Sequence, residues 1–314
     1  MTQKRLFCFG YGYTADFLGR ELQSRGGWSL SGTTRHLPKR QALRQAGIDA
    51  YLFDTDKPLG DPQIMMDGVT HLLISTPTDQ DGDLVYRLHE NDIARLPNLE
   101  WVGYLSTLGV YGDRDGAYVD EKTELRPSSI RGSRRVRAEG DWAGMQRDYD
   151  LPVHIFRLAG IYGPGRSAID SVNAGIARRI LKPGHAFSRI HVEDIVQTII
   201  ASFDRPNPGS AYNVVDDEAA PSHEVIAYAC RLLGRDPPPL VPFDQANLSP
   251  MSMSFYSENK RVRNDKIKQE LGIQLKYPNY RSGLEACLKA EQEAESSGKP
   301  APWHLQITDN SGQF

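Results

Sequence analysis

The sequence predicts an α/β protein whose core is a doubly wound parallel sheet. Short apolar runs of strand length, such as residues 5–9 and 48–53, alternate with stretches of helical periodicity. Such runs are typical of parallel strands that are buried on both faces. A glycine-rich turn directly follows the first run. A chain of 314 residues has room for one such sheet and a smaller additional region.

The first run ends in Gly10-Tyr11-Gly12-Tyr13-Thr14-Ala15, which fits the G-x-G-x-x-G/A pattern of dinucleotide-binding turns. The first glycine makes the tight turn, the second lets a pyrophosphate approach the backbone, and a small third residue allows close helix packing. Phe17, Leu18 and Leu22 then share one helical face, and Gly26-Gly27 ends the helix. We expect a Rossmann-type sheet with an anion site at this helix N-terminus. The alternative is a glycine-rich turn that binds nothing.

The second predicted strand, residues 28–33, is followed by a basic residue. An NAD-binding chain usually places Asp or Glu there for the ribose 2′-hydroxyl, whereas this chain has Arg35, with Lys39 and Arg40 opening the next helix. Charge-assisted hydrogen bonds from Arg35 to a 2′-phosphate would favour NADP(H) over NAD(H). The alternative is a solvated basic helix start, since Lys and Arg are ordinary surface residues.

Polar residues also follow the next two predicted strands, residues 48–53 and 70–74. Asp54 stands where an adenine-contacting acid often sits, and a turn is its alternative role. The loop 75–83 leaves the sheet edge at which open parallel sheets bind ligands. Its aspartates lack the glutamate-bearing continuation of a calcium loop, so we interpret it as a cofactor-covering loop with an N-cap for the next helix. The residues expected to contact the dinucleotide here are Asp54, Ser75 and Thr76.

A fifth predicted strand, residues 101–105, leads into motifs that occur in a characteristic order. With the glycine turn, this ordered set resembles the short-chain dehydrogenase/reductase superfamily, in particular its extended epimerase/dehydratase branch. The resemblance covers nearly the whole chain to about Leu288. The motifs are Ser106-Thr107-Leu108-Gly109-Val110-Tyr111-Gly112, Val119-Asp120-Glu121, Arg157-Leu158-Ala159-Gly160-Ile161-Tyr162-Gly163-Pro164-Gly165, Ile190-His191-Val192-Glu193-Asp194, Ala211-Tyr212-Asn213-Val214-Val215 and Lys260-Arg261-Val262-Arg263-Asn264.

The resemblance implies roles for particular side chains. The family hydroxyl that helps hold the substrate oxygen corresponds to Thr107; the alternative is a strand-end threonine in a backbone bond. Family members then carry Tyr-x-x-x-Lys on the next helix, where Tyr exchanges the proton and Lys lowers its pKa and binds the nicotinamide ribose. Alignment on Pro127, Gly132 and Glu139 puts Arg131 on the Tyr position and Arg135 on the Lys position.

These arginines change the chemistry that the helix can perform. A guanidinium stays protonated at any ordinary pH, so Arg131 cannot serve as the base. Arg135 could still hold a ribose hydroxyl or a phosphate, and together with Arg131 it could clamp an anionic substrate. The alternative is a solvated basic helix face. Tyr111, close to Thr107 in sequence, is the candidate substitute acid; its alternative is a core or cofactor-flanking aromatic.

Two literal Tyr-x-x-x-Lys strings occur elsewhere, at residues 118–122 and 256–260. The first lies in a Gly- and Asp-rich connection, where residues four apart need not stack, and the second lies far downstream, so we interpret both as chance matches. The chain then resembles the atypical members of the superfamily, which keep the dinucleotide fold without the usual catalytic pair.

We expect an NADP(H)-binding, epimerase/dehydratase-like oxidoreductase of this atypical group. Its substrate would be an unknown small molecule, nucleotide-sugar-like or anionic, with a non-standard proton shuttle: Thr107 polarises the reacting oxygen, and Tyr111 or water carries the proton. The competing hypothesis is a redox sensor or scaffold protein that binds the dinucleotide without hydride transfer. A third, that no cofactor binds, is disfavoured by the intact glycine turn.

Composition limits the other classes of function. A net charge of −3 argues against general nucleic-acid affinity, and no apolar run approaches the length of a membrane span or a signal-peptide core. We therefore expect a cytoplasmic protein. Its three cysteines lack paired spacing and are expected to be buried thiols, and we find no metal-ligand cluster. Many relatives dimerise through the helices corresponding to 84–96 and 127–149, and the expectation of a homodimer rests on this analogy.

The expected organisation has three parts. Residues 1–160 form mainly the dinucleotide-binding domain, residues 161–295 mix returning sheet elements with a smaller C-terminal substrate-binding region, and residues 296–314 form a flexible polar tail. A final amphipathic helix is expected over residues 279–294. At the junction near residue 191, we expect His191 to be a packed polar side chain and Asp194 to be a helix cap.

Overall fold

The computed structural model describes residues 3–297. The chain forms two compact units, each described here by itself. The first unit contains residues 3–110, 130–157 and 196–212, and the second contains residues 111–129, 158–195 and 213 onward. The boundary expected near residue 160 thus lies close to one point at which the chain changes unit, and the chain later re-enters the first unit at Val196.

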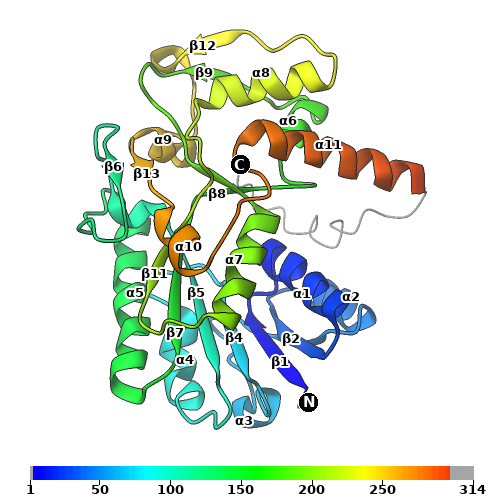
Figure 1. Ribbon diagram of the computed structural model, residues 1–314, viewed down its shortest axis with the longest axis vertical. Helices are drawn as coiled ribbons and strands as arrows, with labels where there is room; N and C mark the ends of the chain where they lie inside the picture. The colour runs from blue at the N-terminus through cyan, green and yellow to red at the C-terminus, as the bar shows by residue number, and fades with distance from the viewer. Residues whose placement is uncertain (1–2, 298–314) are drawn as a thin grey trace. The chain divides into compact units, whose positions relative to one another are not determined.

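The central sheet has seven strands in the order β11-β7-β5-β4-β1-β2-β3 (Figure 1). The pairs β1–β2, β1–β4, β2–β3 and β4–β5 are parallel. The direction of winding reverses between β1 and β4, which makes the carboxyl ends of these two strands the topological switch point. The predicted doubly wound α/β fold is confirmed. The strands are β1 (Lys4–Phe9), β2 (Trp28–Thr34), β3 (Asp49–Leu52), β4 (His71–Ile74), β5 (Trp101–Thr107), β7 (Val153–Leu158) and β11 (Ala211–Val214).

Both faces of the sheet are covered, as the alternation in β1 shows. Leu6 and Phe7 point to opposite faces, and both are fully buried. Phe7 belongs to a core cluster that includes Trp142 of helix α5 (Ile130–Tyr149). On the other face, Leu6 is in register with Leu30, and Leu30 lies beside Gly19 of helix α1 (Tyr13–Arg25). Helices therefore pack on both sides of the sheet.

The helices of the first unit begin and end where local signals place them. Gly26 ends α1 with a positive φ of 72°. Asp83 is the N-cap of α4 (Leu84–Ile93), and its carboxylate accepts a hydrogen bond from the backbone N–H of Tyr86 at 3.0 Å, which confirms the predicted cap. The remaining helices that lie wholly or partly in this unit are α2 (Leu37–Gln45), α3 (Pro62–Met65) and α7 (Val192–Asp204).

The second unit is built from short strand pairs and helices. One core cluster joins Ile169 of α6, Ala229 of α8 and Leu284 of α11. The strand pairs β8–β10, β9–β12 and β6–β13 are parallel. The elements are β6 (Tyr118–Val119), β8 (Gly160–Tyr162), α6 (Ala168–Asn173), β9 (Arg179–Leu181), β10 (Arg189–His191), α8 (Ser222–Leu232), β12 (Leu240–Pro242), a 3-10 turn (Phe243–Gln245), α9 (Pro250–Tyr256), β13 (Arg261–Val262), α10 (Asp265–Glu270) and α11 (Tyr280–Ser297), and a further 3-10 turn, Leu108–Tyr111, follows β5.

His191 and Asp194 both have structural roles. His191 is fully buried between Tyr162 and Tyr277, and burial lowers its pKa to about 4. This confirms the predicted packed side chain. The two carboxylate oxygens of Asp194 accept hydrogen bonds from the backbone N–H groups of Lys276 and Tyr277, at 2.7 and 3.0 Å. Asp194 lies in the first turn of α7, and its carboxylate fixes the loop before α11. The sequence predicted a helix cap and did not predict this contact.

The C-terminal helix is longer than expected. The last helix, α11, extends through Ser297, so Ser296 and Ser297 are helical and do not belong to the predicted tail. The rest of that tail lies outside the described residues.

Within residues 3–297, no helix is both long and apolar enough to cross a bilayer. The three cysteines are buried thiols, as predicted.

Candidate functional site

The glycine turn is fixed between two strands at the switch point. The Gly10 N–H donates to the Thr33 hydroxyl at 2.9 Å, and the Tyr11 N–H donates to the Thr33 carbonyl at 2.7 Å. Gly10 has a φ of +81°, and a Cβ at this position would lie only 3.2 Å from backbone atoms of Ser75 and Thr76. Only glycine combines this backbone conformation with so close an approach to the end of β4.

The second glycine leaves open space above the turn. Gly12 precedes α1 as its N-cap and offers no side-chain cap to the helix. The nearest atom to a Cβ built on Gly12 is the Gly10 carbonyl oxygen, at 3.8 Å. A side chain there would fill the space in front of the first turn of a 13-residue helix, whose N-terminus favours an anion. The turn therefore has the shape and the polarity to receive a pyrophosphate.

The other residues of the turn contribute backbone or packing. Tyr11 is 2% exposed, and its hydroxyl fills the space beside Gly19, so its side chain belongs to the core and only its backbone borders the turn. Thr14 and Ala15 are buried in α1. Tyr13 is half-buried, with its ring centroid 4.9 Å from that of Phe17.

Arg35 and Asp54 follow the ends of β2 and β3. Arg35 is exposed and directly follows β2, where a 2′-phosphate could meet it. Asp54 exchanges backbone hydrogen bonds with Lys57, and its own carboxylate accepts from the Thr55 N–H at 2.8 Å. This is the geometry of the turn that was the alternative interpretation of Asp54.

Arg135 is held at the carboxyl ends of two adjacent strands. Its Nη1 donates to the Tyr104 hydroxyl at 2.8 Å and to the Leu105 carbonyl at 3.0 Å, both in β5. Its Nη2 donates to the Thr76 carbonyl, just after β4, at 3.2 Å. The alternative of a solvated basic helix face is therefore wrong for Arg135, whereas it agrees with the exposure of Arg131, one turn earlier.

A buried acid accompanies this arginine. Asp83 is 1% exposed, and one of its carboxylate oxygens has no hydrogen-bond partner among residues 3–297. Burial raises the pKa of Asp83, while the nearby positive charge of Arg135 acts in the opposite direction. The Thr76 hydroxyl is also buried with no partner in the described part of the chain. Sequence reasoning identified Asp83 only as part of the loop 75–83 and its helix cap, because its proximity to Arg135 depends on the tertiary fold.

The predicted catalytic hydroxyls lie in different surroundings. Thr107 is half-buried at the end of β5, and its hydroxyl oxygen accepts from the Gly109 N–H at 3.2 Å, as in the backbone-bond alternative. Tyr111 is fully buried, and its hydroxyl donates to the side-chain carbonyl of Asn213 at 2.7 Å. This placement favours the core aromatic over the substitute acid.

The two Tyr-x-x-x-Lys strings are not paired as in the family motif. Tyr118 is 64% exposed on β6. Lys260 donates to the Gly112 carbonyl at 2.8 Å and forms an ion pair with Glu258 at 2.5 Å. Tyr256 is buried in a separate small core cluster.

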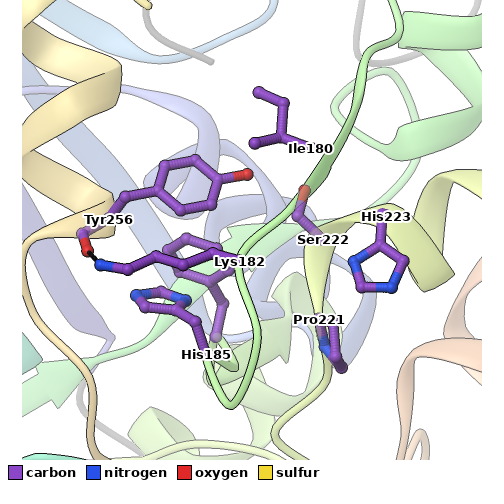
Figure 2. Close-up of a pocket in the computed structure, with 8 residues that line it drawn as sticks. Ile180, Lys182, His185, Pro221, Ser222, His223 and Tyr256 are labelled. Carbon is purple, nitrogen blue, oxygen red and sulfur yellow. Dashed lines mark hydrogen bonds between the residues drawn. The ribbon is translucent and has the colours of Figure 1, made fainter. Parts of the chain in front are cut away.

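A shallow pocket lies within the second unit (Figure 2). Lys182 donates to the Tyr256 carbonyl, and the Tyr256 hydroxyl points toward Ser222. His185 is 3% exposed, and its Nε2 lies 2.9 Å from the Glu258 carbonyl, which makes its Nδ1 an acceptor. Burial lowers the pKa of His185, so the ring is neutral at pH 7. The lining residues, which no local motif marks, are Ile180, Lys182, His185, Phe187, Pro221, Ser222, His223 and Tyr256.

The fold is that of the extended NAD-dependent epimerases and dehydratases. The dTDP-glucose 4,6-dehydratase of Bacillus anthracis, solved in complex with NAD, superposes with a TM-score of 0.74 over 93% of this chain and 98% of that chain, at 17% identity. A functionally unknown conserved protein from Silicibacter pomeroyi superposes with a TM-score of 0.83 over 92% of this chain and 99% of that chain, at 52% identity. The predicted resemblance to the extended branch is confirmed at the level of the fold.

A curated relative places the chain in a family. Protein YeeZ of Escherichia coli K12 is 30% identical over 297 residues, which cover 88% of this chain and 97% of that protein. The chain belongs to the same family as Protein YeeZ. No protein-family model matches the sequence.

Proposed function

We propose that this protein binds NADP(H) at the glycine turn and acts as an epimerase/dehydratase-like oxidoreductase on a small substrate, nucleotide-sugar-like or anionic. Three observations support it: the open space in front of Gly12, the switch point between β1 and β4, and the fold shared with a dehydratase that was solved with NAD. When bound, the dinucleotide would supply or accept a hydride. The observation that carries the proposal is the position of Arg135.

Arg135 takes the place of the lysine that binds the nicotinamide ribose in the family motif. Three of its five N–H donors bind Tyr104, Leu105 and Thr76. The contacts fix a permanent positive charge at the carboxyl ends of β4 and β5, beside the switch point where open α/β sheets bind ligands. The remaining donors can bind a ribose hydroxyl, which is the part of the lysine role that needs no deprotonation.

The proton shuttle in this proposal differs from that of the family. Thr107 lies at the end of β5 and would polarise the reacting oxygen with its hydroxyl proton, since its oxygen already accepts from Gly109. The Tyr111 hydroxyl is bound to Asn213, so a water molecule would carry the proton.

The cofactor preference rests on Arg35, which is exposed after β2 and whose sequence neighbours, Thr34 and His36, are not acidic. We expect Arg35→Ala to weaken NADPH binding by roughly ten- to a hundredfold, the usual effect of losing a charge-assisted bond, and to change NADH binding little. Titration with each nucleotide, followed by energy transfer from the tryptophans, measures both affinities. Arg25→Ala, which removes an exposed arginine paired with Glu21, is the matched control. Equal losses for NADPH and NADH would contradict the NADP(H) preference, and binding of neither nucleotide by the unaltered protein would contradict the function itself.

A dinucleotide sensor without hydride transfer is the second candidate. It is favoured by the exposed guanidinium of Arg131 at the family Tyr position and by the buried, hydrogen-bonded hydroxyl of Tyr111. Reduced-nicotinamide absorbance, followed while carbonyl compounds and nucleotide sugars are added, separates the two candidates. Oxidation of NADPH, or conversion of an added nucleotide sugar to a product without net oxidation, supports the oxidoreductase. Tight binding with neither an absorbance change nor a product across the screen supports the sensor.

A further inference from the structure

A buried ion pair joins helix α5 to two strands of the first unit. Glu139 and Arg157 are 4% and 6% exposed. The Arg157 Nε lies 3.1 Å from both carboxylate oxygens of Glu139, and its Nη2 lies 2.8 Å from Oε2. The Ser106 hydroxyl donates to Glu139 Oε1 at 2.6 Å. The carboxylate of Glu139 is therefore bound on one side by β7 and on the other by β5.

Glu139 lies four residues after Arg135, so the two side chains leave the same face of α5 one turn apart. Arg135 binds Tyr104 and Leu105 of β5, and Glu139 binds the next residue, Ser106. Three consecutive residues of β5 are thus attached to one turn of α5. The helix cannot slide or rotate on the sheet without breaking contacts to β5, to β7 and to the loop after β4 together.

We propose that Glu139 is a positioning residue, which together with Ser106 and Arg157 sets the place of α5 on the sheet and so holds the Arg135 guanidinium at the ends of β4 and β5. This inference rests on the proposed function, because it matters only if Arg135 contacts a dinucleotide. Ser106 directly precedes Thr107, so the same contact also fixes the end of the strand that carries the proposed catalytic hydroxyl.

Stability alone does not require these charges. A buried ion pair is costly to desolvate, and apolar side chains of similar volume often replace both partners without loss of stability. The double variant Glu139→Met with Arg157→Met should therefore remain folded, with a Tm close to that of the unaltered protein. If the pair positions Arg135, this stable variant should bind NADPH roughly tenfold more weakly.

The matched control removes a buried hydrogen bond at the opposite end of β5. There the Trp101 indole N–H donates to the Ser202 hydroxyl at 3.0 Å. Ser202→Ala should lower the Tm and leave NADPH affinity unchanged. Ser106→Ala, with the ion pair intact, should fold and show the weaker affinity of the double variant in milder form. If NADPH affinity follows Tm across these three variants, Glu139 has only a structural role and the proposal is overturned.

A second measurement needs no nucleotide. Arginine side-chain NMR spectra of the nucleotide-free protein should show a restrained Arg135 guanidinium, identified by its loss in Arg135→Lys. This signal should persist in Ser202→Ala and should broaden or shift toward free arginine in the double variant. An unchanged signal overturns the positioning role. If the signal changes as expected but no variant, nor the unaltered protein, binds NADPH or NADH, the proposed function fails while the positioning of Arg135 stands.

Discussion

Arg135 lies against Tyr104 in two ways at once: its Nη1 donates to the phenol oxygen at 2.8 Å, and its guanidinium carbon stands 5.5 Å from the ring centroid. Tyr104 is fully buried, and burial raises the pKa of its hydroxyl. The phenol therefore stays neutral and serves as a fixed acceptor for the guanidinium. A side chain that appears in the sequence as one of several helix arginines is thereby given a single orientation.

We expect Arg135→Met to be destabilising. The substitution leaves the Leu105 and Thr76 carbonyls without this donor, at a cost of about 1–3 kcal/mol, and it should also weaken NADPH binding. Arg135→Lys keeps the charge without the planar fork, so it should recover only part of both losses. Urea unfolding and nucleotide titration measure them. The control, Arg131→Met, alters an exposed arginine one turn earlier and should change stability by no more than about 0.5 kcal/mol.

Gly10→Ala should abolish nucleotide binding as well as lower stability. An alanine at φ +81° is strained, and its Cβ would press on the backbone of Ser75 and Thr76 at 3.2 Å. Gly26→Ala is the control, since Gly26 has a similar φ of +72° but nothing within 4 Å of its Cβ. Each substitution should carry the backbone cost of about 1–3 kcal/mol. Only Gly10→Ala should lose NADPH affinity, and equal affinities for the two variants would show that the close approach to β4 does not matter for binding.

Thr107→Ala should lower turnover by roughly a hundredfold while leaving NADPH affinity unchanged, because a hydroxyl that polarises the reacting oxygen acts only during the chemical step. Thr107→Ser retains the hydroxyl and should retain most of the turnover. Of the contacts described above, Thr107→Ala removes only the hydrogen bond from the Gly109 N–H, and Thr107→Ser keeps that bond. Turnover of Thr107→Ala at the level of the unaltered enzyme would remove Thr107 from the mechanism.

Asp216 should make the protein less stable as the pH rises. It is 3% exposed in the second unit, one of its oxygens has no partner among the described residues, and burial raises its pKa from 3.8 to about 8. A carboxyl whose folded pKa is raised favours folding at low pH, and this stability is lost between about pH 4 and pH 8 as the unfolded chain ionises first.

Asp216→Asn removes this dependence. The variant should gain stability over the unaltered protein as the pH rises from about 5 to about 8, reaching roughly 1–3 kcal/mol at the upper end. Urea unfolding at constant ionic strength measures the difference. Asp265→Asn removes a surface carboxylate of the same unit, which lies 3.8 Å from Arg263, and serves as the control. A difference between Asp216→Asn and the unaltered protein that does not grow with pH would contradict the prediction.

Local patterns were sufficient to predict the sheet and the glycine turn. Apolar runs, a turn with a required positive φ at Gly10, and the Asp83 cap act over a few residues, and the structure reproduces them. The surroundings of the arginines could not be predicted in this way. Arg131 and Arg135 leave the same helix one turn apart, and their different exposure depends on how α5 sits on β5.

The same limit applies to contacts between distant elements. Glu139 and Arg157 lie on different elements and are 18 residues apart, and neither belongs to a local motif that predicts a pair. The hydroxyl of Tyr111 donates a hydrogen bond to Asn213, which lies 102 residues later in the chain. Proximity in sequence suggested instead that Tyr111 would work beside Thr107. Such pairings are set by tertiary packing, which a short sequence window does not contain.

The discontinuity of the first unit restricts the order in which the chain can fold during synthesis. Phe203 packs against Trp28, His71 and Trp101 at the amino ends of their strands, and residues 196–212 complete that unit. A nascent chain that has emerged only to residue 160 would therefore expose these aromatic rings to water. Neither unit can be completed before the ribosome has passed residue 212, so a fragment cut near residue 160 should be prone to aggregate.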